Sequence, residues 1–258
     1  MNNKPPETSK NPHGEMTLLE HLAELRTRLL RAILAVLIAF VPLAFVARPL
    51  YSLFAQPLLR QMPAGTSMIA TEVTAPFITP LKLAFVTALF IAIPYCLHQL
   101  WAFIAPGLYR NEKRFALPLV VLGTVLFYAG AAFAYFVVLP LVFGVLTAMA
   151  PHGVAVMTDM THYMNFMLAM FIAFGTAFQV PIATVLLVWA GITTPAALAA
   201  QRGYVLIGCF AVAMFLTPPD VFSQTFLALP MYALFELGII LARTMVPQQH
   251  GPEEHLEH

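Results

Sequence analysis

Charged residues are scarce in this sequence of 258 residues: they make up 10% of the chain, whereas hydrophobic residues make up 60%. A soluble domain carries roughly 25% charged residues, so this composition excludes an ordinary soluble protein and indicates a chain that crosses a membrane several times. The net charge of only +1 provides no basic field, and no nucleic-acid partner is expected. The connections between the apolar runs are too short to fold as separate soluble domains.

The motifs of common enzyme active sites are also missing. The chain has no GxxxxGK[ST] phosphate-binding loop, no HExxH and no GxSxG, and its eight histidines are scattered. The two cysteines, Cys96 and Cys209, lie in apolar runs, where small packing residues are expected rather than a disulfide or a metal site. We therefore predict no catalytic residue, cofactor or metal, and expect the membrane potential or a partner to drive any work.

Long apolar runs, in contrast, are abundant. A spanning helix needs about 20 apolar residues, and the runs predict an all-α membrane protein with six transmembrane helices. The charge-free run 115–150 is too long for one straight span, so we expect a span at 115–138 and a continuation that Pro140 bends along the outer surface. Two short spans near the C-terminus predict local thinning of the bilayer or a wet groove. The predicted spans are 29–50, 77–104, 115–138, 165–190, 204–217 and 221–241.

Proline interrupts most of these spans, and each proline removes a backbone donor and crowds the preceding turn. Membrane helices tolerate proline, but this number favours kinked helices around a concave, cupped surface over a straight bundle. There is no internal repeat and no GxxxG pair, so an inverted-repeat transporter and glycine-mediated dimer packing lack support. The prolines are Pro42, Pro94, Pro118, Pro140, Pro181 and Pro230.

The basic residues predict the orientation. If the N-terminus is inside, ten of the 13 Lys and Arg residues fall on the inner side, so both termini are expected to be cytoplasmic. We divide the chain into a disordered N-terminal segment (1–17), a six-span domain (18–243) and a disordered tail (244–258). The final LEH of the tail resembles the start of a purification tag.

Polar groups at membrane depth are candidates for function. Gln179 precedes Pro181 by two residues, so its amide either satisfies the carbonyl that this proline frees or bonds a polar residue on another helix. Glu236 lies near the inner end of the last span, where it reaches water or Arg243, although a spacing of i+7 is too long for a simple local pair. Asp220, in TPPD, suits the N-cap of that span.

Two acids stand in inner segments that are otherwise basic: Glu24 in EHLAELRTRL and Glu112 in LYRNEKRF. Glu24 and Arg28 are four residues apart and can pair along one helix. Two interpretations are open. Each glutamate balances its basic neighbours, or the two carboxylates converge on a basic ligand, because carboxylates engage guanidinium groups bidentately.

Several long motifs together resemble the TatC family, the large multispanning subunit of the twin-arginine protein translocase. They are HLAELRTRL, LWAFIAPGLYRNEKR, FYAGAAFAYFVVLPLVFGVL, FGTAFQVPIA and LTPPDVFSQ, and the resemblance covers about 18–243. It implies a cupped, six-span receptor in the bacterial cytoplasmic membrane that binds Arg-Arg signal peptides of folded proteins. It also implies single-span partners of the TatA and TatB type, further copies of the chain, and transport driven by the proton-motive force.

The resemblance also implies roles for single residues. Glu24 and Glu112 match the acids that receive the two arginines, and Arg26, Arg28 and Phe103 match positions near the same surface. Some relatives carry glutamate at Gln179; glutamine cannot titrate, so a hydrogen bond to a partner's span fits this chain better than a proton-carrying role. Further positions matched as partner-docking or structural are Met214, Thr217, Gln224, Gln179, Asp220, Pro57, Pro94 and Tyr135. A secondary transporter and an intramembrane enzyme are the alternative classes, and the sequence offers neither clear midplane acids nor a reactive pair.

Overall fold

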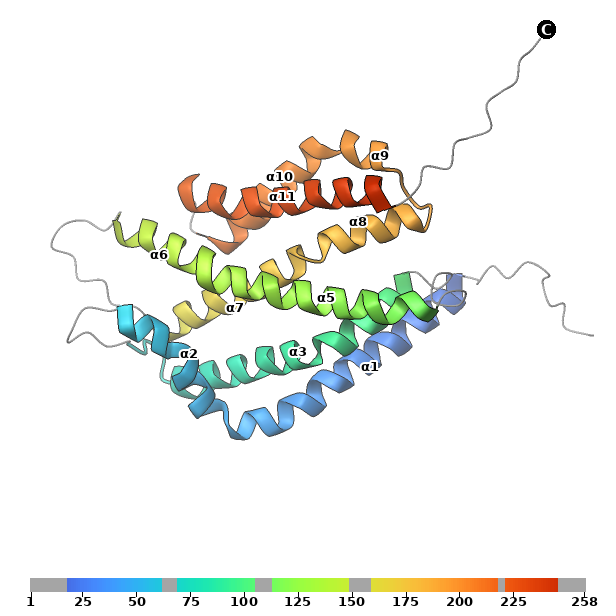
Figure 1. Cartoon of the computed structure of the whole chain (residues 1–258). Coiled ribbons are helices and arrows are strands. Elements are labelled where there is room, and N and C mark those ends of the chain that lie inside the picture. Colours follow the sequence, from blue (N-terminus) through green and yellow to red (C-terminus); the bar gives the residue numbers. More distant parts are fainter. Residues whose placement is uncertain (1–17, 62–68, 105–112, 149–158, 218–220, 246–258) are drawn as a thin grey trace, which may run out of the picture.

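The computed structural model describes residues 18–61, 69–104, 113–148, 159–217 and 221–245, and nearly all of them are helical. Figure 1 shows an elongated bundle in which most helices run roughly along its length. The elements are α1 (Leu18–Phe45), α2 (Ala47–Gln61), α3 (Ala75–Ile104), α5 (Lys113–Phe133), the π-helical turn η1 (Ala134–Val138), α6 (Leu139–Ala148), α7 (Met160–Ala177), α8 (Val180–Trp189), α9 (Pro195–Ala200), α10 (Arg202–Leu216) and α11 (Val221–Met245).

The apolar helices agree with the predicted spans. Within the described ranges, five stretches are long and apolar enough to cross a membrane: Leu22–Phe45, Ala75–Phe103, Pro118–Gly144, Met160–Trp189 and Val221–Thr244. The remaining predicted span, 204–217, corresponds to α10, which has only 15 residues. The all-α membrane class is therefore confirmed, while the count of six crossings, the cytoplasmic termini and the cupped surface stay predictions. The predicted tails lie almost wholly outside the described residues.

Helix α2 was not predicted: its first residues, 47–50, were assigned to the first span and the rest to the outer connection that follows. The chain leaves α1 and begins α2 after a single residue, Val46. The N–H of Leu50 donates to the carbonyl of Val46 at 3.1 Å, so the new helix starts its hydrogen bonds at once. Pro49 lies in the first turn, where its missing N–H costs no helical hydrogen bond. Arg48, Gln56 and Arg60 interrupt its apolar residues, so a search for apolar runs overlooks this helix.

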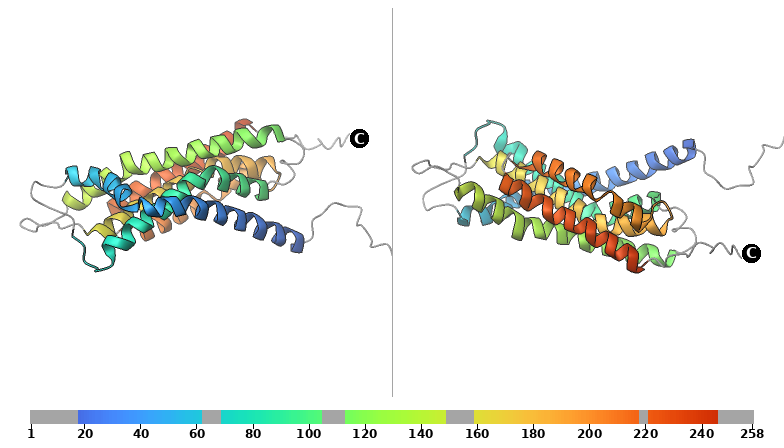
Figure 2. Two further views of the ribbon diagram at one scale, coloured as in Figure 1. Left: turned by 90° about the horizontal axis from the view of Figure 1, so that it is seen from below. Right: turned by 90° about the horizontal axis from the view of Figure 1, so that it is seen from above.

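The third span also differs from the prediction. Helix α5 passes through η1 into α6 without a break, and Figures 1 and 2 show α5 and α6 continuing in nearly the same direction. The N–H of Leu139 donates to the carbonyl of Ala134, five residues back. This wider turn lies directly before Pro140 and gives room to its ring, so the predicted bend along the outer surface is not formed.

Small residues set the distances between helices. Helix α1 rests on α3 through Val36, which packs against the buried Ala88 and Ala92, while most of the rest of α1 stays exposed. In Figure 2 the N-terminal part of α1 points away from the other helices. Helices α5 and α7 approach so closely that a Cβ on Gly130 would lie 2.5 Å from the carbonyl oxygen of Phe174. The sequence has no GxxxG, yet single glycines and an alanine pair give the same close packing.

Candidate binding site

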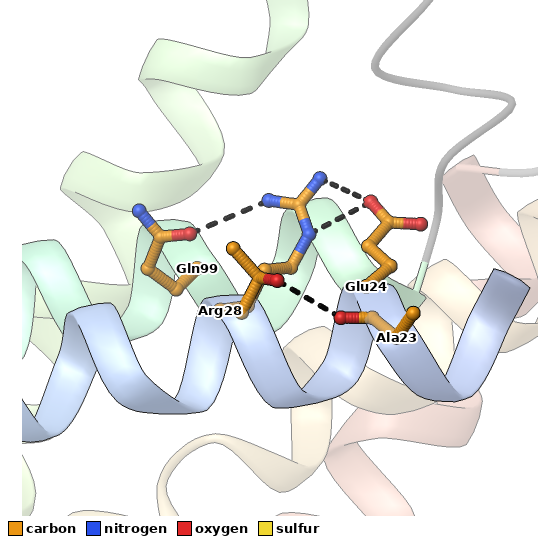
Figure 3. Close-up of polar contacts among 5 residues, drawn as sticks. Ala23, Glu24, Arg28 and Gln99 are labelled. Atoms are coloured by element: carbon orange, nitrogen blue, oxygen red, sulfur yellow. Dashed lines mark hydrogen bonds and ion pairs between the residues drawn. The ribbon is translucent and has the colours of Figure 1, made fainter.

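A carboxylate and a guanidinium group meet where α1 passes the last turns of α3. Glu24 and Arg28 lie one turn apart on α1, so helical geometry places both on one face. The Nε and one terminal nitrogen of Arg28 donate to Oε1 of Glu24 at 2.8 and 2.5 Å. The other terminal nitrogen of Arg28 donates to Oε1 of Gln99 on α3 at 3.4 Å (Figure 3). The pairing of Glu24 with Arg28 is thus confirmed.

The second oxygen of Glu24 is the unusual atom of this site. Oε2 is buried and has no hydrogen-bond partner among the described residues, although the side chain as a whole is 23% exposed. A buried carboxylate oxygen without a donor is costly, by about 1–3 kcal/mol for polar groups in general. The site therefore holds a buried carboxylate oxygen whose capacity to accept a hydrogen bond is unused within the described part of the chain.

The neighbouring residues differ in how they face this site. Gln99 is 6% exposed, and Phe103 follows it one turn later on α3 and is half-buried. Arg26 is exposed on α1. Glu112 lies outside the described residues, so its predicted convergence with Glu24 stays a prediction. Gln99 was not predicted, because an uncharged amide at the end of an apolar run is only a weak indication of function. The one indication in the sequence was its spacing of four residues from Phe103, which places both on one face of a helix.

Gln179 links the centre of the bundle. Helices α7 and α8 are separated by Phe178 and Gln179, and Pro181 occupies the first turn of α8. The side-chain amide of Gln179 donates to the carbonyl of Gly123 on α5 at 2.7 Å. The bond therefore reaches another helix, as one alternative held, but its acceptor is the backbone and not a polar side chain. Oε1 of Gln179 and Nε1 of Trp101 are buried, and neither has a hydrogen-bond partner among the described residues.

The three residues matched to partner docking on α10 and α11 have different surroundings. Met214 is 52% exposed and presents its side chain outward. Thr217 is buried, and its hydroxyl donates to the carbonyl of Ala213 at 2.9 Å. Gln224 is half-buried, and its amide donates to the carbonyl of Phe210 at 3.1 Å, which joins α11 to α10. Of the three, Met214 offers the most surface to a partner.

Glu236 forms an ion pair with a residue that was not predicted as its partner. Arg202, at the start of α10, donates from two nitrogens to the two oxygens of Glu236, both at 2.7 Å. The hydroxyl of Tyr232 donates to the same carboxylate at 2.8 Å. Arg202 thus replaces Arg243 as the ion-pair partner and joins α10 to α11, while the Glu236 side chain, 25% exposed, still reaches solvent as expected. This contact could not be predicted from local spacing, because the two residues are 34 positions apart.

A second carboxylate that the sequence did not single out lies at the other end of the molecule. Asp159 caps α7: its Oδ1 accepts from the N–H groups of Thr161 and His162 at 2.8 and 2.9 Å. Its Oδ2 accepts from the N–H and the hydroxyl of Thr71 at 3.0 and 2.8 Å. These donors favour the ionised form and hold the pKa of Asp159 well below its ordinary value. Asp159 therefore ties the segment before α3 to the start of α7.

Of the remaining predicted positions, two lie half-buried within helices and two fall outside the described residues. Pro94 lies inside α3 and is half-buried. Tyr135 lies in η1, half-buried, with its ring against Phe136 and Phe171. Asp220 and the side chain of Pro57 lie outside the described residues, so the proposed N-cap is not tested. Across the described ranges, no group of three or more His, Cys, Asp or Glu side chains is placed to hold a metal ion.

Together these features define a multi-pass α-helical membrane protein with a carboxylate–guanidinium site at one end. The sequence model of the family described as "Sec-independent protein translocase protein (TatC)" matches residues 20–230. The chain belongs to this TatC family.

Individual relatives agree over nearly the whole length. The Sec-independent protein translocase protein TatC of Escherichia coli (strain K12) is 53% identical over 237 residues, which cover 92% of each chain. The protein of the same name from Azotobacter chroococcum mcd 1 is 54% identical over 225 residues, covering 87% of this chain and 88% of the relative. A crystal structure of the twin arginine translocase receptor TatC superposes with a TM-score of 0.77 at 35% identity, covering 87% and 99% of the two chains.

The family assignment fixes the general function. The chain is a TatC-type subunit of the Sec-independent, twin-arginine protein translocase, and its apolar helices make it a multi-pass membrane protein. The family is a translocase component, and membership indicates no enzymatic activity. The alternative classes of secondary transporter and intramembrane enzyme receive no support from these relatives.

Proposed function

We propose that this chain is the receptor and core subunit of the translocase, and that it binds the Arg-Arg signal peptides of folded proteins. Glu24 and Glu112 receive the two arginines, with Arg26, Arg28 and Phe103 around them. The single observation that carries this proposal is the buried Oε2 of Glu24, which has no hydrogen-bond partner among the described residues. A guanidinium group from a ligand supplies the missing donor with opposite charge and directional N–H groups.

The arrangement of the helix ends supports a two-point site. Figures 1 and 2 show the start of α1, the end of α3 and the start of α5 at one end of the molecule. Glu112 immediately precedes Lys113, the first residue of α5. Its position in the chain is therefore next to an element that begins at the same end as Glu24. In this proposal the carboxylates of Glu24 and Glu112 match the two positive charges of an Arg-Arg motif.

The location, orientation, partners and energy source proposed for the chain are those of its family. The protein lies in the bacterial cytoplasmic membrane with both termini in the cytoplasm, so that the Glu24 end faces newly made cargo. Single-span proteins of the TatA and TatB type assemble with it, as do other copies of the chain, and the proton-motive force drives transport. The exposed side chain of Met214 on α10 supports a lateral surface for such helices.

The proposal is tested by binding a labelled signal peptide to membranes that contain the inserted protein. An Arg-Arg peptide is compared with its Lys-Lys version, because lysine keeps the charge but lacks the planar fork of donors. We expect the wild type to prefer the Arg-Arg peptide, and Glu24→Ala or Glu112→Ala to abolish this preference. Glu20→Ala, which removes an acid one turn earlier on α1, is the matched control and should retain it. Equal binding of both peptides, or full binding by both variants, would contradict the receptor assignment.

A further inference from the structure

We propose that Arg28 is a positioning residue of the signal-peptide site: it holds one oxygen of Glu24 and leaves the other, which is buried in this structure, as the acceptor that the ligand's guanidinium engages when it enters the site. This inference rests on the proposed function and assigns a mechanism to one of its residues. Arg28 carries the same charge as the ligand's arginines, so its presence beside the acid that should bind them needs an explanation. A positive charge there opposes a cationic ligand unless it contributes in another way.

The hydrogen bonds of Arg28 give the first support. Two of its nitrogens donate to the same atom, Oε1 of Glu24, and leave Oε2 untouched. A fork-to-fork pair would instead have used both oxygens and blocked the carboxylate. The two groups thus form a pair that leaves one acceptor unused, and Figure 3 shows this oxygen on the side of the carboxylate away from Arg28.

The contact with α3 gives the second support. The remaining terminal nitrogen of Arg28 donates to Oε1 of Gln99, which is almost fully buried. The guanidinium therefore bridges α1 and α3, and this bridge restricts the rotation of Arg28 and, through it, of Glu24. The N-terminal part of α1 otherwise points away from the bundle, so a link to α3 is needed to fix the carboxylate. A fixed acceptor binds a ligand without losing side-chain entropy at that step.

The geometry also limits how Glu24 recognises arginine. With Oε1 held by Arg28, the ligand's guanidinium meets Oε2 alone, so Glu24 does not form a fork-to-fork pair with it. Discrimination between arginine and lysine then depends on where the Oε2 atom points, and it should be lost when the atom is free to move. Arg28 and Gln99 thereby become determinants of specificity that need not touch the peptide.

The direction in which one substitution changes the affinity for the Arg-Arg peptide separates this mechanism from simple charge repulsion. If Arg28 only repels or competes with the ligand, Arg28→Gln should tighten binding of the Arg-Arg peptide. If Arg28 positions Glu24, the same change should weaken that binding by about tenfold or more, as expected for losing a hydrogen bond to a charged group. Arg31→Gln is the matched control: it removes an equal charge from an exposed position one turn later on α1 and should not weaken binding.

The experiment measures the affinity of Arg-Arg and Lys-Lys peptides for the full-length protein in lipid nanodiscs. We expect Arg28→Gln and Gln99→Leu to lower the Arg-Arg affinity and the Arg/Lys preference, with thermal unfolding near that of the wild type. Adding Arg28→Gln to Glu24→Gln should cause no further loss, because Arg28 acts through Glu24. If Arg28→Gln is a poorly folded variant, Gln99→Leu and the Arg28→Lys variant test the same bridge from its two sides.

The outcomes distinguish the inference from the proposed function. A wild type that does not prefer the Arg-Arg peptide overturns the receptor proposal itself. A wild type that prefers it and loses the preference in Glu24→Gln, but keeps or improves it in both Arg28→Gln and Gln99→Leu, overturns only the positioning role. Additive losses for Glu24→Gln and Arg28→Gln would also overturn it, because they would mean that Arg28 contacts the peptide directly.

Discussion

The side-chain amide of Gln179 donates to the carbonyl of Gly123 at 2.7 Å and so joins the break between α7 and α8 to the middle of α5. This bond lies among buried apolar side chains, which include Leu97 and Phe127. It gives Gln179 a role within the chain that needs no partner. A Cβ at position 123 would lie 3.2 Å from Oε1 of Gln179, so the glycine also lets the amide approach.

Replacing Gln179 with methionine tests this role. The volume is nearly conserved while the hydrogen bond is lost, and we expect the free energy of unfolding to fall by about 1 kcal/mol. Removal of the unpartnered Oε1 offsets part of the loss, which keeps the change small. Thermal unfolding in detergent measures it, with the exposed Gln201→Met as the control. Equal stability of the two variants would show that the bond contributes nothing.

Gly130→Ala should be strongly destabilising. The added Cβ would lie 2.5 Å from the carbonyl oxygen of Phe174, and a backbone atom within α7 cannot move aside as a flexible side chain can. We expect a loss of about 1–3 kcal/mol from overpacking between α5 and α7. Gly208→Ala on α10 is the matched control, because among the described residues no other helix comes within 4 Å of a Cβ at this position, and alanine favours a helix. Comparable unfolding temperatures for the two variants would contradict the close approach.

Asp159→Asn should loosen the end of the molecule opposite to the Glu24 site. Oδ2 accepts two hydrogen bonds from Thr71, and an amide placed there would present a donor to a donor. At neutral pH we expect faster hydrogen exchange of the amides of Thr71 and of the first turn of α7. Glu72→Gln, at an exposed neighbouring position, should leave these rates unchanged.

The pH dependence of this contact has a defined sign. The pKa of Asp159 in the folded protein lies below its ordinary value of 3.8, so ionisation stabilises the folded state. Its contribution is fully present above about pH 4 and is lost as the pH falls towards the folded pKa. The difference in thermal unfolding between wild type and Asp159→Asn should therefore be larger at pH 7 than at pH 3. A constant difference would mean that the charge of Asp159 is not what matters.

The sequence predicted the main helices because apolar run length is a direct consequence of burial in lipid. It did not predict α2, because Arg48 and Arg60 interrupt the apolar residues of that helix. It did not predict the straight course through Pro140 either, because no residue pattern distinguishes a π-helical turn from an α-helical one. The close packing of α5 on α7 was not predicted for another reason. Gly130 and Gly175 are on different helices, so their complementarity appears only once the helices are paired.

The candidate site was predictable where helical spacing determines it. Glu24 and Arg28 are one turn apart, so their contact follows from the period of the helix. Gln99 and the ion pair of Arg202 with Glu236 could not be read from spacing, because each bond joins two helices whose relative rotation is set by packing. For Gln179, a hydrogen bond to another helix was one of the two alternatives. The acceptor could not be predicted, because it is a backbone carbonyl, which every residue carries.

Photo-crosslinking from position 103 tests the central claim most directly. A photoreactive phenylalanine analogue replaces Phe103, one turn beyond Gln99 on α3, and a second version carries it at the exposed Glu72, which precedes the opposite end of α3. We predict that the Arg-Arg peptide crosslinks from position 103 and not from position 72, and that Glu24→Gln or a Lys-Lys peptide abolishes the product. Crosslinking that persists from position 103 in Glu24→Gln, or that is equally strong from position 72, would contradict arginine recognition at Glu24.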